Sequence, residues 1–484
     1  MQKRLCGREQ EFGIKISPIP KRYLGGSFEE WRNSIVKKIL LRIPEITPAI
    51  SCKSEYNFWL GNGSRIYEDM LSIEVAGAEH EIGSFDGIAQ EKASELILNK
   101  AAKLIVGLHG LDSINFYKNN TGPDDEEGTG FVREISYGSH HNYSYLARKR
   151  QRVIRLMKNF IPAMLPISGS GHVLEKNSGF IYVFSPRANH IVKDVGEDTT
   201  GERAVVDLRG DSDDDPLMDR ESGLNRLHVI SRDATRCEFQ TWLVDMITHL
   251  VLRLAEEDWH LPYRFSLRHP TSELHRLNAG IDLKYKMKLE RGQLSPVDYN
   301  FLFLRAAKQL KPLSQAEKKC LEEWERILRI LKAGAFNKLV GELDWATKLY
   351  LIKNQAKKGS SGFIDAWQID MEYHNISNNP RVSWFARLDD KGYIKHLVDK
   401  EQIKRAVTNP PETRAKSRGR FIRKFLKNPH SSRNLIRLDW EMAETNEEIV
   451  YFGTRENPFS TKSIIEPITQ KESFQRRIQR SFPH

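Results

Sequence analysis

The chain has 484 residues, and 39% of them are hydrophobic, so it is long enough to bury a large core. Its formal charge of +11 allows nucleic acid, an acidic protein or nucleotide phosphates as partners, and equally a plain solvated surface. No CxxC pair, signal-peptide core or membrane-length apolar run is present, so we expect a cytoplasmic protein without a structural zinc site.

The first two predicted strands each place polar side chains on one face, because side chains alternate along a strand with period two. On the first strand these side chains are Glu9 and Glu11. On the second they are Arg65, Tyr67 and Asp69. Carboxylate oxygens are ligands that Mg²⁺ prefers, and a guanidinium binds phosphate, so the two strands together suit a magnesium-nucleotide site. An exposed, charged strand face is the alternative.

Glu74 and Glu79 come directly after the second strand, and further elements follow from the hydrophobic periodicity of the chain. The predicted helices run from Gln90 to Val106, from Thr241 to Glu256 and from Ser314 to about Gly334. A capping-box pattern, Ser314 with Glu317, marks the start of the last helix. The predicted strands include Phe180 to Ser185, Leu227 to Ser231 and Ile449 to Phe452. Helices and strands are mixed without a regular βαβ alternation, which favours the α+β class.

The C-terminal part of the chain differs in composition from the rest. Basic residues are dense between Lys404 and Lys427, and the segment Asn409-Pro410-Pro411 marks a junction. We therefore predict a large domain over residues 1–404 and a small C-terminal domain over residues 405–484. Aromatic residues are not interleaved with the basic cluster as an RNA-stacking surface requires, so a nucleic-acid partner is not favoured.

Short segments along the whole chain occur in the same order in one known protein family. They include EQEFG (Glu9 to Gly13), NGSRIYED (Asn62 to Asp69), YGSHHNY (Tyr137 to Tyr143), FSPRA (Phe184 to Ala188), RLHVI (Arg226 to Ile230), NPPETRAKSRGR (Asn409 to Arg420) and LDW (Leu438 to Trp440). Each segment alone is weak, but their number and order are specific. On these segments the chain resembles the Pup ligase and depupylase family of bacterial proteasome accessory factors.

The resemblance implies a glutamine-synthetase-like α+β fold, in which a large domain with a curved antiparallel sheet carries the nucleotide site and a small C-terminal domain completes it. It also implies ATP and Mg²⁺ as cofactors, with a Pup-like protein modifier and lysine-bearing proteins as partners. Ligases of the family phosphorylate the side-chain carboxylate of the modifier's C-terminal glutamate, and a lysine amine then displaces the phosphate. Depupylases hydrolyse the resulting isopeptide bond and deamidate a C-terminal glutamine.

The resemblance further implies roles for individual residues. Glu9, Tyr67 and Glu74 match metal-ligand positions, and Glu11 is expected to support the same cluster. Asp69 matches the catalytic carboxylate, which has to take a proton from the lysine because an ammonium group is not a nucleophile. Without the resemblance, Asp69 would more simply be a turn or helix cap.

Five further residues are counted as cofactor-binding in the expected nucleotide site. They are Arg65, Gly77, Trp440, Arg187 and Arg209. Arg65 and Trp440 match residues that contact the nucleotide in the family, and Gly77 stands where the family has a threonine. Arg187 is expected to bind substrate or phosphate, with a surface charge as the equal alternative. Arg209 lies in a segment, Val206 to Asp211, that replaces the family's usual one.

Three histidines are expected to have hydrogen-bonding or structural roles. His140 and His141 are adjacent on a predicted strand, so their side chains point to opposite faces and cannot readily bind one ion. His228 lies in RLHVI and is expected to support the site or the scaffold. His141 also stands where the family has a glutamate.

The direction of the reaction follows from weaker signs. The segments that are closer to depupylases are SGSG (Ser168 to Gly171), VGEDTT (Val195 to Thr200), ELDW (Glu342 to Trp345), NPPETRA (Asn409 to Ala415) and YGSHHNY (Tyr137 to Tyr143). The spacing from Asp69 to Glu74 is also depupylase-like, whereas NPFS (Asn457 to Ser460) is closer to ligases. The residues from Ile14 to Leu60 are also too few for the long loop of depupylases. We expect a depupylase- or deamidase-like enzyme with Asp69 as the catalytic carboxylate. A ligase that forms a glutamyl-lysine isopeptide bond is the alternative, and a non-catalytic nucleotide-binding homologue is the second alternative.

Overall fold

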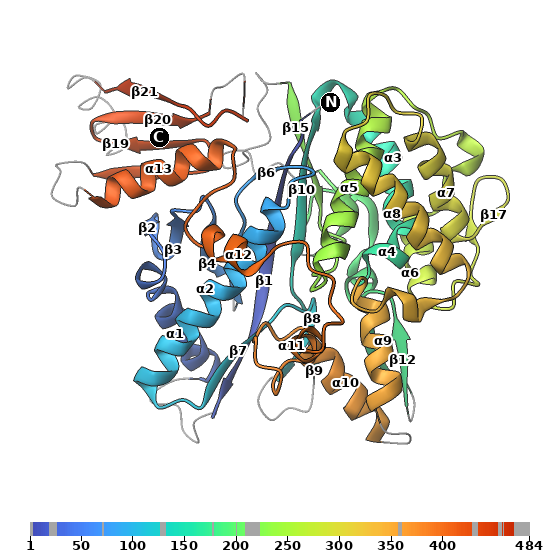
Figure 1. Cartoon of the computed structure of the whole chain (residues 1–484), viewed down its shortest axis with the longest axis horizontal. Coiled ribbons are helices and arrows are strands. Elements are labelled where there is room, and N and C mark those ends of the chain that lie inside the picture. Colours follow the sequence, from blue (N-terminus) through green and yellow to red (C-terminus); the bar gives the residue numbers. More distant parts are fainter. Residues whose placement is uncertain are drawn as a thin grey trace.

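A large, mostly antiparallel sheet organises the chain (Figure 1). The computed structural model describes residues 3–18, 27–69, 72–125, 132–176, 179–199, 201–208, 223–356, 361–427, 434–453, 457 and 459–468. Within these residues the sheet contains β1 (Leu5–Ser17), β2 (Ala49–Cys52), β3 (Ser54–Leu60), β4 (Arg65–Asp69), β5 (Ser72–Ala76), β6 (His80–Glu81), β7 (Ser113–Tyr117), β10 (Ser139–Leu146), β13 (Lys193–Gly196), β14 (Ala204–Asp207) and β15 (Leu224–Val229). Their order is β13-β14-β15-β10-β1-β5-β4-β3-β2, and β6 and β7 also pair with β1.

β1 lies inside the large sheet and contributes side chains to both of its faces. It pairs antiparallel with β10, β5, β6 and β7. Alternation along the strand turns Arg8 and Phe12 to one face, and Glu9 and Glu11 to the other. Phe12 lies in the main hydrophobic core, and Arg8 forms an ion pair with Asp245. The first face is therefore covered by packed helices, and the second carries the acidic side chains.

Helices make up most of the remaining described chain. They are α1 (Phe28–Leu40), α2 (Asp86–His109), α3 (Arg150–Ala163), α4 (Leu165–Ser168), α5 (Glu238–Glu256), α6 (Pro270–Asn278), α7 (Pro296–Ala307), α8 (Gln315–Lys332), α9 (Asp344–Gln355), α10 (Ser361–Tyr373), α11 (Trp384–Asp390), α12 (Lys400–Ala406) and α13 (Arg414–Lys427). α2 and α5 lie against β1 and β10 (Figure 1). The three helices predicted from the sequence are confirmed as α2, α5 and α8. The capping box is present as well, because Ser314 Oγ accepts from Glu317 N at 3.2 Å and Glu317 Oε2 accepts from Ser314 N at 2.6 Å.

Short hairpins lie outside the two larger sheets. The hairpins pair β8 (Thr121–Asp125) with β9 (Val132–Ser136), β11 (His172–Lys176) with β12 (Gly179–Val183), and β16 (Met287–Lys288) with β17 (Gln293–Leu294).

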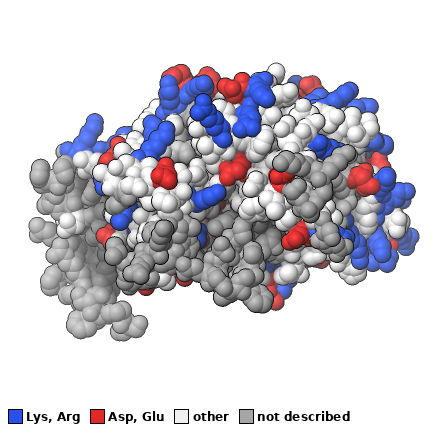
Figure 2. All heavy atoms as spheres, turned by 90° about the horizontal axis from the view of Figure 1, so that it is seen from below, with Lys and Arg blue, Asp and Glu red and all other residues white. Residues whose placement is uncertain are grey.

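On the face shown in Figure 2, Lys and Arg side chains are interspersed with Asp and Glu. None of the helices in the described ranges is long and apolar enough to cross a membrane.

A second, smaller sheet lies at the C-terminal end of the described chain (Figure 1). It consists of β18 (Leu435–Leu438), β19 (Met442–Thr445), β20 (Glu448–Phe452) and β21 (Ser463–Pro467). A separate hydrophobic cluster joins it to α13 and to the large sheet through Ile422, Phe452 and Trp59. The predicted α+β class, with a large sheet and a small C-terminal one, is confirmed. The predicted boundary between residues 404 and 405 falls inside α12 and stays a prediction.

α13 docks directly on the turn that leads into β4. A side-chain carbon added to Gly419 would lie 2.3 Å from the carbonyl oxygen of Gly61. Arg423 Nη1 donates to the same carbonyl at 2.6 Å and to the carbonyl of Thr408 at 2.8 Å. The helix therefore touches the backbone of the turn where only a glycine hydrogen fits.

Replacing Gly419 by alanine is expected to lower the free energy of unfolding by about 1–3 kcal/mol, because the new methyl group meets the backbone carbonyl of Gly61, which cannot turn away as a side chain can. The matched control is Gly107→Ala in α2, where an added carbon meets nothing within 4 Å. That control is expected to raise stability by about 0.5–1 kcal/mol through helix propensity. Urea unfolding measures both variants, and a stabilised Gly419→Ala protein would contradict the docking of α13.

Candidate active site

Three carboxylates meet on the face of the sheet opposite the helices. The strand register sets Glu11 opposite Glu74 between β1 and β5, and Glu74 opposite Tyr67 between β5 and β4. Asp69 follows Tyr67 by two residues and so shares its face. Oxygen atoms of Glu11, Asp69 and Glu74 lie within 4.8 Å of one another. The structure thus brings together three of the predicted acidic residues from neighbouring strands.

Glu9 lies at the centre of a second polar group, on the β10 side of β1. His140 Nδ1 lies 3.1 Å from Glu9 Oε2, and His228 Nε2 lies 3.8 Å from the same oxygen. Asn142 Nδ2 donates to Glu9 Oε1 at 3.1 Å, and Arg226 Nη2 lies 3.5 Å from that oxygen. Sequence reasoning expected supporting roles for the two histidines but missed Asn142 and Arg226. Each stands two residues from one of the histidines on its strand, so strand alternation was the signal that could have found it.

The two groups differ in their electrostatics. Burial raises the pKa of Glu74 well above its usual range, and the charges of Glu9 and Glu11 raise it further. Burial and then the charge of Glu11 also raise the pKa of Asp69. For Glu9, burial acts in the same direction, but the hydrogen bond with His140 and the nearby cations outweigh it and lower the pKa. The first group therefore combines crowded negative charge with hard oxygen donors, which is the chemistry that suits Mg²⁺.

Tyr67, Arg65 and Trp440 extend from the carboxylates toward the small sheet. Burial and then the charge of Glu74 raise the pKa of Tyr67, so its hydroxyl stays protonated and forms a hydrogen bond with Glu74. The Arg65 guanidinium lies 4.3 Å from the ring centre of Tyr67 and 5.4 Å from that of Trp59. Trp59 meets Trp440 edge-on, with ring centres 4.8 Å apart. Arg65 and Trp440 thus lie at the same end of the site, with Trp59 between them.

Two predicted cofactor-binding residues contribute no described side chain. Gly77 has none, and its backbone N–H already donates to the carbonyl of Arg8 at 2.8 Å. Arg209 lies outside the described residues. From the same altered segment, Asp207 is described, and its Oδ1 lies 3.4 Å from Nδ1 of His228. The altered segment therefore extends the polar group on β1, β10 and β15.

Arg187 is buried behind His140, so the alternative of a surface charge is wrong. Its Nε donates to the carbonyl of Ile230 and its Nη1 to the carbonyl of Tyr137, both at 2.8 Å, and its Nη2 lies 3.5 Å from Nε2 of His140. Burial and then the charge of Arg203, a residue that sequence reasoning missed, lower its pKa to about 10. The guanidinium holds the backbone around His140, and direct binding of substrate or phosphate stays a prediction.

His141, where the chain departs from the family pattern, lies on the helix face of the sheet. Its Nδ1 is 3.2 Å from the hydroxyl of Tyr143 and 3.5 Å from Oδ1 of Asp245. Burial, which the Asp245 hydrogen bond only partly offsets, lowers its pKa to about 4. His140 and His141 face opposite sides of β10 as predicted, so this departure leaves the acidic face unchanged.

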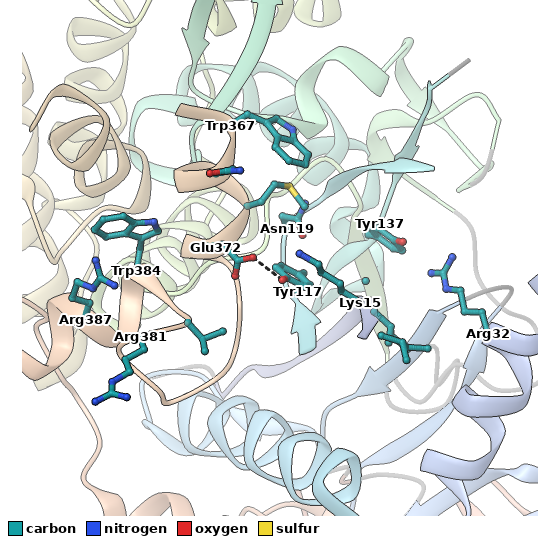
Figure 3. Close-up of a pocket in the computed structure, with 16 residues that line it drawn as sticks. Lys15, Arg32, Tyr117, Asn119, Tyr137, Trp367, Glu372, Arg381, Trp384 and Arg387 are labelled. Atoms are coloured by element: carbon teal, nitrogen blue, oxygen red, sulfur yellow. Dashed lines mark hydrogen bonds between the residues drawn. The ribbon is translucent and has the colours of Figure 1, made fainter. Parts of the chain in front are cut away.

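A cavity of about 640 Å³ is lined by residues 13–16, the part of β1 that follows Glu11, and is shown in Figure 3. The cavity is also close to Glu11 through a second segment. The carbonyl of Gly138 accepts from Glu11 N at 3.1 Å, and the preceding residue, Tyr137, lines the cavity. In Figure 3, Lys15 and Tyr137 stand on one side of the space and α10 and α11 present their side chains on the other. The basic and aromatic lining residues are Lys15, Arg32, Arg381, Arg387, Tyr117, Tyr137, Trp367 and Trp384. Such a lining suits a peptide that carries carboxylates and apolar side chains.

Comparison with known proteins places the chain among ligases. The family model described as Pup-ligase protein matches residues 4–444. A Pup–protein ligase of Acidimicrobium ferrooxidans is 30% identical over 479 residues, which covers 96% of this chain and 97% of that protein. A Pup–protein ligase of Pseudarthrobacter chlorophenolicus is 31% identical over 444 residues, covering 88% and 90%.

Solved structures show the same fold. The ligase PafA in its complex with the prokaryotic ubiquitin-like protein Pup matches with a TM-score of 0.76 at 23% identity, covering 100% of this chain and 96% of that one. PafA in complex with ADP matches with a TM-score of 0.70 at 24% identity, covering 97% and 98%.

The prediction of a depupylase-like enzyme was wrong, because the matching family model and the relatives named above are ligases. Two of the segments that favoured it, SGSG and VGEDTT, make contacts within the scaffold. The carbonyl of Gly171 accepts from the buried Lys348, and Ser170 N donates to Asp233. Val195 belongs to the strand at one end of the large sheet. Segments that hold a shared scaffold together carry no information about the direction of the reaction.

Replacing Gly138 by alanine is expected to disturb the site without unfolding the protein. The added carbon would lie 2.4 Å from Oε1 of Glu11 and 2.9 Å from Nε2 of His140, and both atoms are ends of side chains that can turn away. We expect binding of Mg²⁺ or Mn²⁺ to weaken about 10- to 100-fold, as for other losses of ligand orientation. Gly179→Ala in β12, where nothing lies within 4 Å, is the control. Calorimetric titration that finds the same cation affinity in both variants would argue against Glu11 as part of a metal site.

Proposed function

Since this chain belongs to the family of Pup ligases, we propose that it joins a Pup-like protein to lysine side chains of target proteins, with ATP as the energy source. The bond formed is an isopeptide bond between the side-chain carboxylate of the modifier's C-terminal glutamate and the lysine ε-amine. The observation that carries the proposal is the convergence of Glu11, Asp69 and Glu74 beside Arg65 on one face of the sheet. A carboxylate-amine ligase needs carboxylates to bind a metal ion, a cation to bind phosphate, and a base to accept a proton.

Magnesium binding is assigned to the carboxylates of Glu9, Glu11 and Glu74, with Tyr67 at their side. Their oxygens match the hard donors that Mg²⁺ takes in nucleotide sites. Bound Mg²⁺ would supply the positive charge that offsets the phosphate oxygens of ATP. Tyr67, which stays protonated, would act through its hydrogen bond to Glu74 as well as by any direct contact.

Nucleotide binding is assigned to the end of the site where the two sheets meet. Arg65 is half-buried, and its Nε donates to Asn57 Oδ1 at 2.8 Å, which leaves the rest of the guanidinium to face a phosphate. The half-buried indole of Trp440 offers an aromatic edge or face for the base. The two side chains are separated by Trp59, so one nucleotide would span them.

Asp69 is proposed as the catalytic base. The γ-phosphoryl group of ATP passes to the modifier's glutamate carboxylate and ADP is released. The lysine amine then attacks the carbonyl carbon, the C–N bond forms and phosphate leaves. Asp69 takes the proton that the ammonium group must lose before this attack. Burial and the charge of Glu11 raise the pKa of Asp69 toward the working pH, which makes its carboxylate a better base.

The cavity beside the site supports a protein modifier as substrate. It is lined by Gly13, two residues after Glu11 on β1, and by Lys15, Arg381 and Arg387, so it complements an acidic peptide that ends in a free glutamate (Figure 3). The tryptophans Trp367 and Trp384 supply apolar surface for its other side chains.

The first test is intact-mass spectrometry of the protein with Mg-ATP, a Pup-like protein ending in glutamate and a lysine-bearing target. A ligase adds the mass of the modifier to the target, less one water. A second tube contains a preformed conjugate instead of free modifier. Release of modifier in that tube, without ligation in the first, would refute the proposed direction.

Replacing Asp69 by asparagine is expected to reduce ligation at least about 100-fold, because the amide cannot accept the lysine proton. ADP binding, measured by calorimetry, is expected to persist because the nucleotide end of the site is unchanged. The matched control is Glu68→Gln on the same strand, whose carboxylate faces Lys37 at 3.9 Å on the other side of the sheet. Full ligation by Asp69→Asn would remove Asp69 from the proposed mechanism.

Replacing Glu9 by alanine is expected to weaken Mg-ADP binding by about tenfold or more, because it removes a hard oxygen donor and leaves His140 and His228 without their shared partner. Glu81→Ala, whose partner is the exposed Lys3, is the control for loss of one surface carboxylate. Calorimetry with and without Mg²⁺ separates metal from nucleotide binding. Equal affinities in the two variants would count against the assignment of Glu9 to the metal site.

A further inference from the structure

Glu79 follows β5 and is not used by the proposed chemistry, yet it is one of the residues that connect the large sheet to α13 and the small sheet. Arg418 of α13 is completely buried and forms a two-pronged ion pair with Glu79, whose Oε1 accepts from Arg418 Nη1 at 3.2 Å. Arg414 Nε donates to the same oxygen at 3.0 Å. Thr413 Oγ1 donates to the backbone carbonyl of Glu79 at 2.6 Å. The carboxylate of Glu79 therefore binds the first two turns of α13 to the segment that follows β5.

Arg418 also donates hydrogen bonds to two backbone carbonyls at the proposed nucleotide-binding end of the site, one in the large sheet's turn before β4 and one in the small sheet. Its Nε and Nη2 donate to the carbonyl of Gly63, at 3.1 and 2.7 Å, in the turn before β4. Its Nη1 also donates to the carbonyl of Trp440 at 2.7 Å. The guanidinium lies 4.6 Å from the ring centre of Trp440 and 5.6 Å from that of Trp59. Arg418 thus contacts both the backbone carbonyl and the indole ring of Trp440, and its guanidinium is held in place by the ion pair with Glu79.

This arrangement is poorly explained as a device for stability alone. Burying an ion pair costs desolvation that its Coulomb attraction often only balances, so such pairs are weak contributors to stability. α13 is also docked independently by Arg423, which donates to the carbonyls of Gly61 and Thr408. What the pair adds is geometry, because a forked guanidinium fixes the direction of each group that it contacts.

We propose that Glu79 and Arg418 are positioning residues that set Trp440 against the nucleotide base and thereby determine nucleotide affinity. This inference rests on the proposed function only in that Trp440 contacts the nucleotide. Glu79 itself touches neither substrate nor metal in this assignment. It acts through Arg418, which holds the indole, in the turn between β18 and β19, in place relative to Arg65 on β4.

The test compares Glu79→Gln with Glu256→Gln. Glu256 also pairs with a buried arginine, Arg4, at 2.6 Å, and both partners are 1% exposed, but they lie away from Trp440. ADP affinity is measured by calorimetry and stability by thermal unfolding. Both variants are expected to unfold at lower temperature, whereas only Glu79→Gln weakens ADP binding, by about tenfold. In ligation assays it raises KM for ATP and leaves kcat and KM for the modifier nearly unchanged.

A double-mutant cycle tests whether Glu79 acts through the indole. In a Trp440→Ala background, Glu79→Gln is expected to cause no further loss of ADP affinity. Equal ADP affinities for Glu79→Gln and Glu256→Gln, or an undiminished effect of Glu79→Gln without the indole, would overturn the inference. Wild-type protein that binds no ADP would instead overturn the proposed function. If Glu79→Gln does not fold, Arg418→Lys replaces it, since lysine keeps the charge but loses the fork, and the same loss of ADP affinity is expected.

Discussion

The crowding of carboxylates on one face of the sheet is the constraint on which the site depends. Glu11, Asp69 and Glu74 come within 4.8 Å because β1, β5 and β4 present them at adjacent positions of the register. Like charges at this separation disfavour ionisation, and burial adds to the effect, as the raised pKa of Glu74 reflects. The backbone ladder holds the side chains in place against this repulsion, so a bound cation would stabilise the arrangement.

The surrounding structure divides the site into parts with different electrostatic character. Around Glu9, side chains of β10 and β15 already supply hydrogen bonds and positive charge, which lower its pKa. On the other side, Arg65 and Trp440 offer a cation and an aromatic ring where the small sheet meets the large one. Beyond Glu11 lies the basic and aromatic cavity. A carboxylate-amine ligase needs such a sequence of environments, because nucleotide, metal and protein substrate have to meet at one point.

Much of the local structure followed from the sequence, and so did the family. The capping box at Ser314 begins α8 as predicted, since a cap is a contact between residues three apart. Period-two alternation correctly separated His140 from His141. The direction of the reaction was misjudged, because segments such as SGSG (Ser168 to Gly171) support the scaffold instead of the chemistry. The family model and the named relatives gave the ligase assignment.

The sequence by itself determined which side chains share a strand face, because alternation is a property of a single strand. Only the tertiary structure decided which strands are neighbours, and with it that His140 and His228 both reach Glu9. The same holds for Glu79 and Arg418, which are 339 residues apart and meet only when α13 docks beside β5. Contacts of this kind depend on the packing of the whole chain, since no local period links the two residues.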